Sequence, residues 1–179
     1  MKRSLLILIT LIVGIFLSTT DAWSQDWVID VEDNSILASV NGKVTHGDKM
    51  SFRVPKGSCN TVQQYFSFYT TTDNIYINQL NGAVVPIELN GRKFYAKVLF
   101  EAPFLSGHGV LFTLGSYNIE DITKHYENTT SLKSKILSND GSIENFKAED
   151  FFDVLHNEWD MTNFANSMNE AKAKCLALD

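Results

Sequence analysis

The stretch VVPIELNGRKFYAKVLFE, residues 84–101, determines the fold class. Two runs rich in apolar and β-branched residues, 83–89 and 92–101, are separated only by Asn90-Gly91. Both turn residues adopt positive φ at low cost, and such a two-residue turn matches the right-handed twist of the strands that it joins. The stretch therefore predicts an antiparallel β-hairpin. Pro86 cannot donate a hydrogen bond to a neighbouring strand, so its strand is expected at a sheet edge or at a bulge.

The same turn chemistry recurs on the N-terminal side of this hairpin. Asn41-Gly42 and Asn81-Gly82 are also flanked by apolar or β-branched residues, and they predict two further hairpins. The other expected strands are 27–31, 35–40, 43–46, 49–54, 62–70, 75–80 and 109–115. Many short strands without intervening helices predict an antiparallel β-sandwich or a barrel-like body over residues 25–117, and we favour the sandwich.

Side chains alternate with period two in several of these strands, so each has one buried and one partly wet face. The expected inward residues are Met50, Phe52 and Val54, then Phe66 and Phe68, and then Phe94, Ala96, Val98 and Phe100. The opposite faces carry Tyr65, Tyr69 and Tyr95. If their strands are neighbours, these tyrosines form an outer stripe suited to binding a protein or a glycan. Otherwise they are ordinary residues of half-exposed strands or are covered by helices.

The C-terminal part, residues 118–179, is expected to be helical and to dock on the β body, which gives a mainly β, α+β fold. Asn118 is a suitable N-cap for a helix over 119–127, and a second short helix is expected over 148–157. Residues 128–147 are polar and irregular. The last helix begins after a cap at Asp160 or Thr162. Its apolar stripe consists of Met161, Phe164, Met168, Ala171, Cys175 and Leu178.

Residues 1–24 have the three-part pattern of a cleaved Sec-type signal peptide. Lys2 and Arg3 precede an apolar run from Leu5 to Leu17, and Ala22-Trp23-Ser24 places small residues at the two positions read by the peptidase. The apolar run is shorter than the roughly 20 residues of a membrane span. We therefore expect a periplasmic or extracellular protein that contacts the membrane only through this segment.

Cys59 and Cys175 are the two cysteines of the chain, and both follow the signal segment. An oxidising compartment favours one intramolecular disulfide between them. Two buried free thiols or an intermolecular bond are the alternatives. Chain-entropy models assign about 4–5 kcal/mol to a loop of this length, and measured values are commonly about 2–4 kcal/mol. The bond would tie the last helix to the start of the sheet.

Composition excludes several classes of function. The chain has 179 residues, 15 basic and 21 acidic, and its net charge of −6 argues against nucleic acid as a partner. The histidines form no metal-binding pair, and the chain has no phosphate-binding loop, dinucleotide fingerprint or nucleophile elbow. No metal or cofactor is therefore expected.

Catalytic residues could still be assembled from distant loops. His108 lies between two glycines, His46 is two residues from Asp48, and acidic residues cluster at Glu149, Asp150 and Asp153. A tight turn, a local Asx turn and a helix start explain these three features without catalysis, and we favour those explanations.

Three hypotheses of function follow from the sequence. The favoured one is a small, exported, disulfide-tethered binding or interaction protein whose partner is a protein or glycan of the cell envelope. The first alternative is an envelope hydrolase that uses His46, His108 and the acidic loops. The second alternative is a carrier of a small ligand, with an apolar cavity inside the β body.

Overall fold

In the residues that the structure describes, the fold is one continuous antiparallel sheet of nine strands with two α-helices. The structure is a computed structural model, and it describes residues 26–45, 47–72 and 74–178. The strands lie in the order β1-β2-β3-β4-β7-β6-β5-β8-β9. Their bounds are β1 (Val28–Val31), β2 (Ser35–Asn41), β3 (Lys49–Pro55), β4 (Thr61–Thr70), β5 (Val84–Leu89), β6 (Arg92–Phe104), β7 (Gly107–Asn118), β8 (Ser131–Ile136) and β9 (His156–Asp160).

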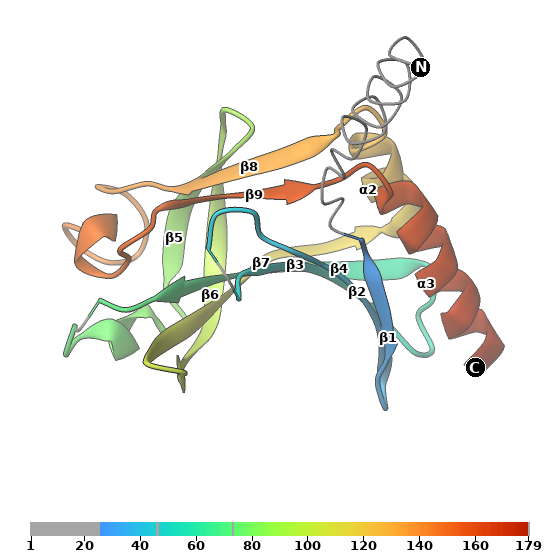
Figure 1. The fold of residues 1–179 in the computed structure, drawn as a ribbon, viewed down its shortest axis with the longest axis horizontal. Coiled ribbons are helices and arrows are strands. Elements are labelled where there is room, and N and C mark those ends of the chain that lie inside the picture. Colours follow the sequence, from blue (N-terminus) through green and yellow to red (C-terminus); the bar gives the residue numbers. More distant parts are fainter. Residues whose placement is uncertain (1–25, 46, 73, 179) are drawn as a thin grey trace, which may run out of the picture.

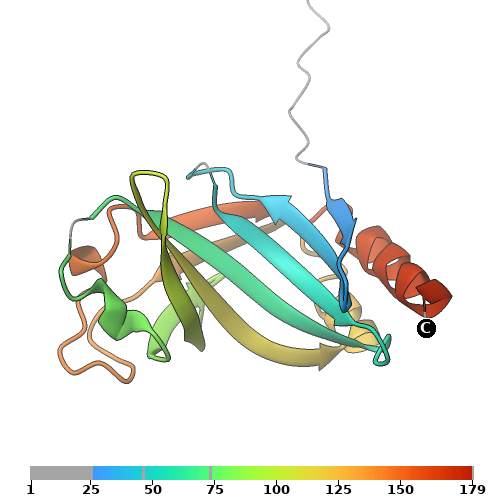
Figure 2. The ribbon, with the colours of Figure 1, turned by 90° about the horizontal axis from the view of Figure 1, so that it is seen from below.

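The sheet curls into a half-barrel, and α3 (Phe164–Leu178) packs against its β1–β2–β3 side (Figures 1 and 2). The predicted mainly β fold with docked helices is confirmed, in its barrel-like version. The favoured sandwich is wrong, because all nine described strands belong to one sheet whose concave face encloses the core.

The Asn90-Gly91 hairpin is confirmed. Leu89 pairs with Arg92, and the two turn residues have φ of 46° and 79°. The predicted edge position of β5 is wrong, because β5 lies between β6 and β8. Pro86 is tolerated there because the ladder to β8 begins only at Ile87, so no neighbour requires an N–H from Pro86.

The other two Asn-Gly pairs do not form two-residue hairpins. β2 ends at Asn41 and β3 begins at Lys49, and the described residues between them, 42–45 and 47–48, form no strand; of the strand expected at 43–46, residues 43–45 are therefore wrong and residue 46 lies outside the described residues. Residues 75–80 are not a strand either, since Ile77–Leu80 forms the 3-10 helix η1. Gly82 follows η1 with a φ of 77° and turns the chain into β5. An Asn-Gly pair thus marks a sharp turn but does not fix what it connects.

Two bulges set which side chains face inward. In β6, Val98 pairs with Phe112 and Phe100 with Leu111, so Leu99 is an extra residue. The extra residue moves Phe100 to the outer face, where it is 50% exposed, and its predicted inward position is wrong. Phe94 is also partly exposed. The other inward residues expected from period two are buried.

Two groups of aromatic side chains fill the concave face. Phe66 and Phe112 stack with ring centroids 4.8 Å apart, and Phe68, Phe152 and Trp159 surround them. At the α3 end, Phe164 contacts the rings of Trp27, Phe52 and Tyr126. These side chains belong to one core, which joins the four strands β3, β4, β7 and β9 with α3 and the C-cap of α2.

The C-terminal part is less helical than expected. The helix α2 (Ile119–His125) is confirmed, and its N-cap Asn118 accepts a hydrogen bond from the Glu120 amide. The expected helix over 148–157 is wrong, because only the 3-10 turn η2 (Ala148–Asp150) forms and β9 follows. β8 likewise lies in the segment expected to be irregular. Its Leu132, Ser134 and Ile136 face inward between exposed lysines.

The predicted disulfide joins Cys59 and Cys175, whose Cα atoms are 5.6 Å apart. Cys175 lies on the buried stripe of α3 together with Phe164, Met168 and Ala171, as the helical periodicity predicted. Leu178, the last residue of the expected stripe, is exposed. The bond therefore fixes the C-terminal half of α3, beyond the aromatic contacts of its first turn.

We predict that reduction loosens this half of α3 before it unfolds the sheet. Amides from Ala171 to Leu178 should then exchange with deuterium at least tenfold faster, while those of β4 and β7 stay protected. Removal of a native disulfide from a small secreted domain costs about 2–5 kcal/mol. Hydrogen-exchange mass spectrometry of the Cys59→Ala/Cys175→Ala protein would measure this. Equal acceleration in the sheet and the helix would contradict the prediction.

Candidate functional site

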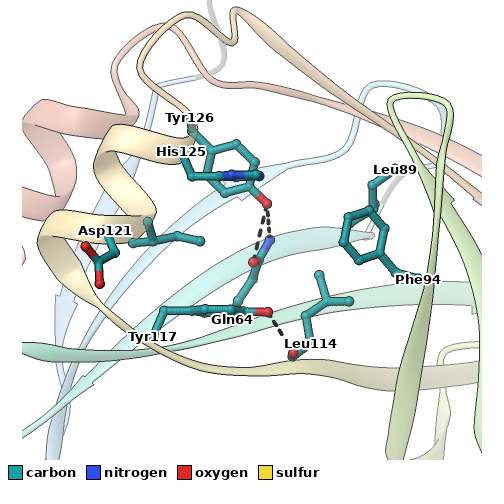
Figure 3. Close-up of a pocket in the computed structure, with 9 residues that line it drawn as sticks. Gln64, Leu89, Phe94, Leu114, Tyr117, Asp121, His125 and Tyr126 are labelled. Atoms are coloured by element: carbon teal, nitrogen blue, oxygen red, sulfur yellow. Dashed lines mark hydrogen bonds between the residues drawn. The ribbon is translucent and has the colours of Figure 1, made fainter.

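An open cleft of about 260 Å³ lies between α2 and the inner faces of β4, β5, β6 and β7 (Figure 3). Its lining residues are Gln64, Leu89, Phe94, Leu114, Tyr117, Asp121, Ile122, His125 and Tyr126. The aromatic filling of the half-barrel stops at Phe66, and the cleft begins at the next inward position of β4, Gln64.

The second bulge of the sheet shapes the cleft. Gln64 pairs with Gly115 and Tyr65 with Thr113, so Leu114 is the extra residue of β7. The Thr113 hydroxyl accepts a hydrogen bond from the Gly115 amide at 3.1 Å and donates to the Gln64 carbonyl at 3.2 Å. Gly115 has a φ of 114°, a conformation that L side chains rarely adopt. The bulge directs Leu114 into the cleft (Figure 3).

Two buried polar side chains, Gln64 and Tyr126, form the floor. Gln64 Nε2 donates to Tyr126 Oη at 3.1 Å, and Tyr126 Oη is 3.4 Å from Gln64 Oε1 (Figure 3). Phe52 and Phe164 hold the Tyr126 ring in edge contacts. Burial raises the pKa of Tyr126, with Gln64 acting in the opposite direction, so the phenol stays protonated at neutral pH.

A second hollow of about 270 Å³ adjoins the cleft. It shares Leu89, Phe94, His125 and Tyr126 with the cleft and is otherwise lined by Asn90, Arg92, Thr129 and Leu132. The shared side chains separate the cleft, which is the more apolar chamber, from the second hollow, which is more polar. Asp121 and His125 lie one helical turn apart on α2, so α2 lines the cleft along its length.

Three polar side chains of the cleft lining, Gln64, Tyr117 and Tyr126, bond to groups of the chain itself. Gln64 and Tyr126 bond each other, and the Tyr117 hydroxyl donates to the Leu114 carbonyl at 2.7 Å. None of the lining side chains is a hydroxyl or thiol that bonds to a histidine or carboxylate, the arrangement expected of an activated nucleophile. The apolar walls with a few fixed polar groups are typical of a small-molecule site.

The residues of the hydrolase hypothesis do not assemble in the described part of the chain. His108 Nδ1 lies 2.8 Å from Glu101 Oε1, in a hydrogen bond between β7 and β6. Glu149 accepts from Ser138, and Asp153 accepts from Thr71. Asp150 contributes its backbone carbonyl to Asn74. His46 lies outside the described residues. None of the hydrogen bonds or ion pairs of the described residues joins His108 to the acidic cluster.

Asp48 is a fully buried carboxylate at the point where the curled sheet meets its own far edge. Its two oxygens accept from the Tyr69 amide and from Asn157 Nδ2, both at 2.6 Å. Beside it, the Lys43 amide donates to the Glu158 carbonyl of β9. We call these contacts the latch, since they connect the β2–β3 loop to β9. Burial raises the pKa of Asp48 to about 7, although its two hydrogen bonds favour the ionised form.

The three tyrosines of the predicted binding face lie in separate surroundings. Tyr65 and Tyr69 are on the outer face of β4, but β7 separates β4 from the strand of Tyr95. Tyr65 bonds Gln63 and packs against Arg53. Tyr69 contacts Phe104 and the Ser106 hydroxyl. Tyr95 and Lys93 both donate to Asp140, whose pKa these bonds lower to about 2.

The residues that form the cleft are not among the site residues predicted from the sequence. Gln64 carried a usable signal, because it is a polar residue at an inward position between Val62 and Phe66. Leu114 carried none, since its direction depends on a bulge that only the pairing of β4 with β7 creates.

Neither protein-family models, curated protein sequences nor solved structures give a significant match to this chain. Among the described residues, no group of three or more His, Cys, Asp or Glu side chains is arranged to hold a metal ion. No helix in the described part of the chain is long and apolar enough to cross a bilayer. The predicted signal peptide, residues 1–24, lies outside the described residues. The disulfide is typical of an oxidising compartment.

We predict that Asp48 makes the protein more stable at pH 5 than at pH 8. The folded-state pKa is raised, so the contribution of Asp48 is fully present below its unfolded pKa of 3.8 and is lost as the pH rises to about 7. Each pH unit between these values corresponds to about 1.4 kcal/mol. Between pH 5 and pH 8, wild type should therefore lose ~3 kcal/mol more than Asp48→Asn in urea unfolding.

The matched control is Asp30→Asn, which removes an exposed carboxylate of β1. It should keep the pH dependence of wild type. The comparison uses the change in the free energy of unfolding with pH, so it remains valid if Asp48→Asn is less stable at every pH. Parallel curves for wild type and Asp48→Asn would show that Asp48 does not titrate in this range.

Proposed function

We propose that this chain is a binding protein for a small, largely apolar molecule, which occupies the cleft between α2 and the sheet. The observation that carries the proposal is an apolar chamber whose floor holds two buried, mutually bonded polar side chains, Gln64 and Tyr126. A site of this kind gives affinity through its apolar walls and orientation through its polar floor. This corresponds to the ligand-carrier hypothesis, within the broader expectation of an exported binding protein.

The size of the cleft limits the ligand. An apolar cavity of about 150 Å³ holds benzene. A chamber of about 260 Å³ therefore admits a molecule of about ten non-hydrogen atoms, and a longer one would extend past Phe94 into the adjoining hollow. Export through residues 1–24 would place this activity in the periplasm or outside the cell.

The outer face of the sheet supports a second candidate function, the binding of an envelope protein. Two adjoining hollows of about 310 and 240 Å³ share Phe100 and Leu111. Tyr65 lines the first and Phe104 the second. The exposed leucines and phenylalanines favour an apolar protein segment over a glycan as the occupant.

We predict that Leu114→Trp closes the cleft and weakens binding of butylbenzene, a probe without hydrogen-bonding groups, at least tenfold. The larger side chain would occupy the chamber into which the bulge directs Leu114. Titration of the isotope-labelled proteins, followed by backbone amide NMR, would measure this through the signals of Ile122 and Tyr126.

Leu99→Trp is the matched control, since Leu99 is the extra residue of the other bulge and lies away from the cleft lining. It should leave the affinity for butylbenzene within about twofold of wild type. The proposed function is wrong if wild type shows no chemical-shift changes around the cleft, either with butylbenzene or with straight-chain alkyl compounds of similar length.

For the outer face, we predict that Phe100→Ser abolishes capture of an envelope protein that wild type retains. The comparison uses a cross-linked envelope fraction, with Leu114→Trp as the control because it alters the cleft alone. A partner retained equally by Phe100→Ser and wild type would refute this second candidate, and a partner released by free oligosaccharide would identify a glycan interaction instead.

A further inference from the structure

The floor of the cleft has unused hydrogen-bonding capacity of two kinds. Gln64 Nε2 donates to Tyr126 Oη at 3.1 Å and contacts Met50 Sδ at 3.6 Å, so both of its N–H groups are engaged. Among the described residues, the one hydrogen-bond partner of Gln64 Oε1 is Tyr126 Oη, at 3.4 Å. An O–H···O bond is ordinarily about 2.5–3.0 Å long. The floor therefore presents one acceptor, Gln64 Oε1, beside one donor, the Tyr126 hydroxyl proton, which is poorly satisfied within the chain.

Both groups are withdrawn from water. Gln64 is 1% exposed and Tyr126 is 7% exposed. A buried hydroxyl or amide without a good partner is costly, and a ligand that completes its bonds recovers that cost on binding. Tyr117, the other hydroxyl of the lining, offers no such capacity as a donor, because its proton is already given to the Leu114 carbonyl at 2.7 Å.

Charge restricts the group that can occupy this floor. None of the residues lining the chamber is Lys or Arg, and its one histidine, His125, is exposed on α2, so a carboxylate or phosphate at the floor would be buried without a Lys or Arg partner. Asp121 is the one acidic residue of the lining, and it lies on the exposed side of α2 rather than at the floor. A cation at the floor would likewise be separated from its counter-charge. The floor suits a neutral group that both accepts and donates one hydrogen bond.

We propose, building on the proposed binding function, that the ligand is a neutral alcohol or phenol whose hydroxyl accepts from Tyr126 Oη and donates to Gln64 Oε1. Its apolar body lies against Leu89, Phe94 and Leu114. Insertion of the hydroxyl replaces the long contact between Tyr126 and Gln64 with two bonds of ordinary length. The chamber thereby selects the polar group of the ligand, while the walls accept a range of apolar bodies.

The test compares four probes of similar length: octan-1-ol, heptyl methyl ether, octanoate and octylammonium. The ether accepts a hydrogen bond but cannot donate one. Backbone amide NMR titrations at pH 7 should show octan-1-ol bound about tenfold more tightly than the two ions and about threefold more tightly than the ether. Equal affinities, or tighter binding of an ion, would overturn the proposal.

Two variants assign the selectivity to the floor. Tyr126→Phe removes the donor and should lower the affinity for octan-1-ol about three- to tenfold while leaving that for butylbenzene unchanged, which also shows that the variant is folded. Tyr76→Phe, the matched control, removes an exposed hydroxyl at the N-cap of η1, outside the cleft lining, and should not weaken binding of octan-1-ol. An unchanged affinity of Tyr126→Phe for octan-1-ol would overturn the assignment of the floor. Absence of binding by butylbenzene and all four probes to wild type would instead overturn the proposed function.

Discussion

A curled sheet must fill its concave face with its own side chains, and this requirement governs the whole structure. A single sheet has no second sheet to cover its inner face, so each inward residue packs against residues of other strands and of the C-terminal segments. The stacked rings of Phe66 and Phe112 provide the centre of this filling, and Trp159 and Phe152 bring the chain beyond residue 150 into it. The sheet and its C-terminal part are therefore one packing unit, because neither buries its aromatic residues alone.

The cleft lies where this filling ends. The next inward side chain of β4 after Phe66 is the amide of Gln64. In the neighbouring strand β7, a bulge at the same level inserts Leu114. A further pair of aromatic side chains at this level would have continued the filling of the concave face. The sequence instead places a hydrogen-bonded pair there and covers it with a helix of only seven residues. The site is thus a local departure from a packing rule that the rest of the core obeys, which is typical of binding sites.

The sequence predicts the local features well and the long-range ones poorly. The Asn90-Gly91 hairpin, the Asn118 cap and the α3 stripe follow from neighbouring residues, and the structure contains all three. β9 could not be predicted in this way, since Trp159 is its only large apolar residue and its strand conformation depends on pairing with β8. The bulges at Leu99 and Leu114 likewise arise from the pairing of neighbouring strands. The alternation of side chains along a single strand therefore could not predict the outward orientation of Phe100 or most of the cleft.

Two sets of contacts, the disulfide and the latch, stabilise the curled sheet, and each is connected to the cleft through different elements. The disulfide anchors α3, whose Phe164 packs edge-on against the ring of Tyr126, so the position of the Tyr126 hydroxyl depends on a helix tied through Cys175. The latch at Asp48 joins the β2–β3 loop to β9, and β9 pairs with β8, whose Leu132 lines the hollow next to the cleft. The disulfide requires oxidation, and the latch contributes less to folding stability as Asp48 ionises, because burial of the charged form costs more than its two hydrogen bonds recover. An oxidising, mildly acidic environment is therefore the one in which both walls of the site are held most firmly.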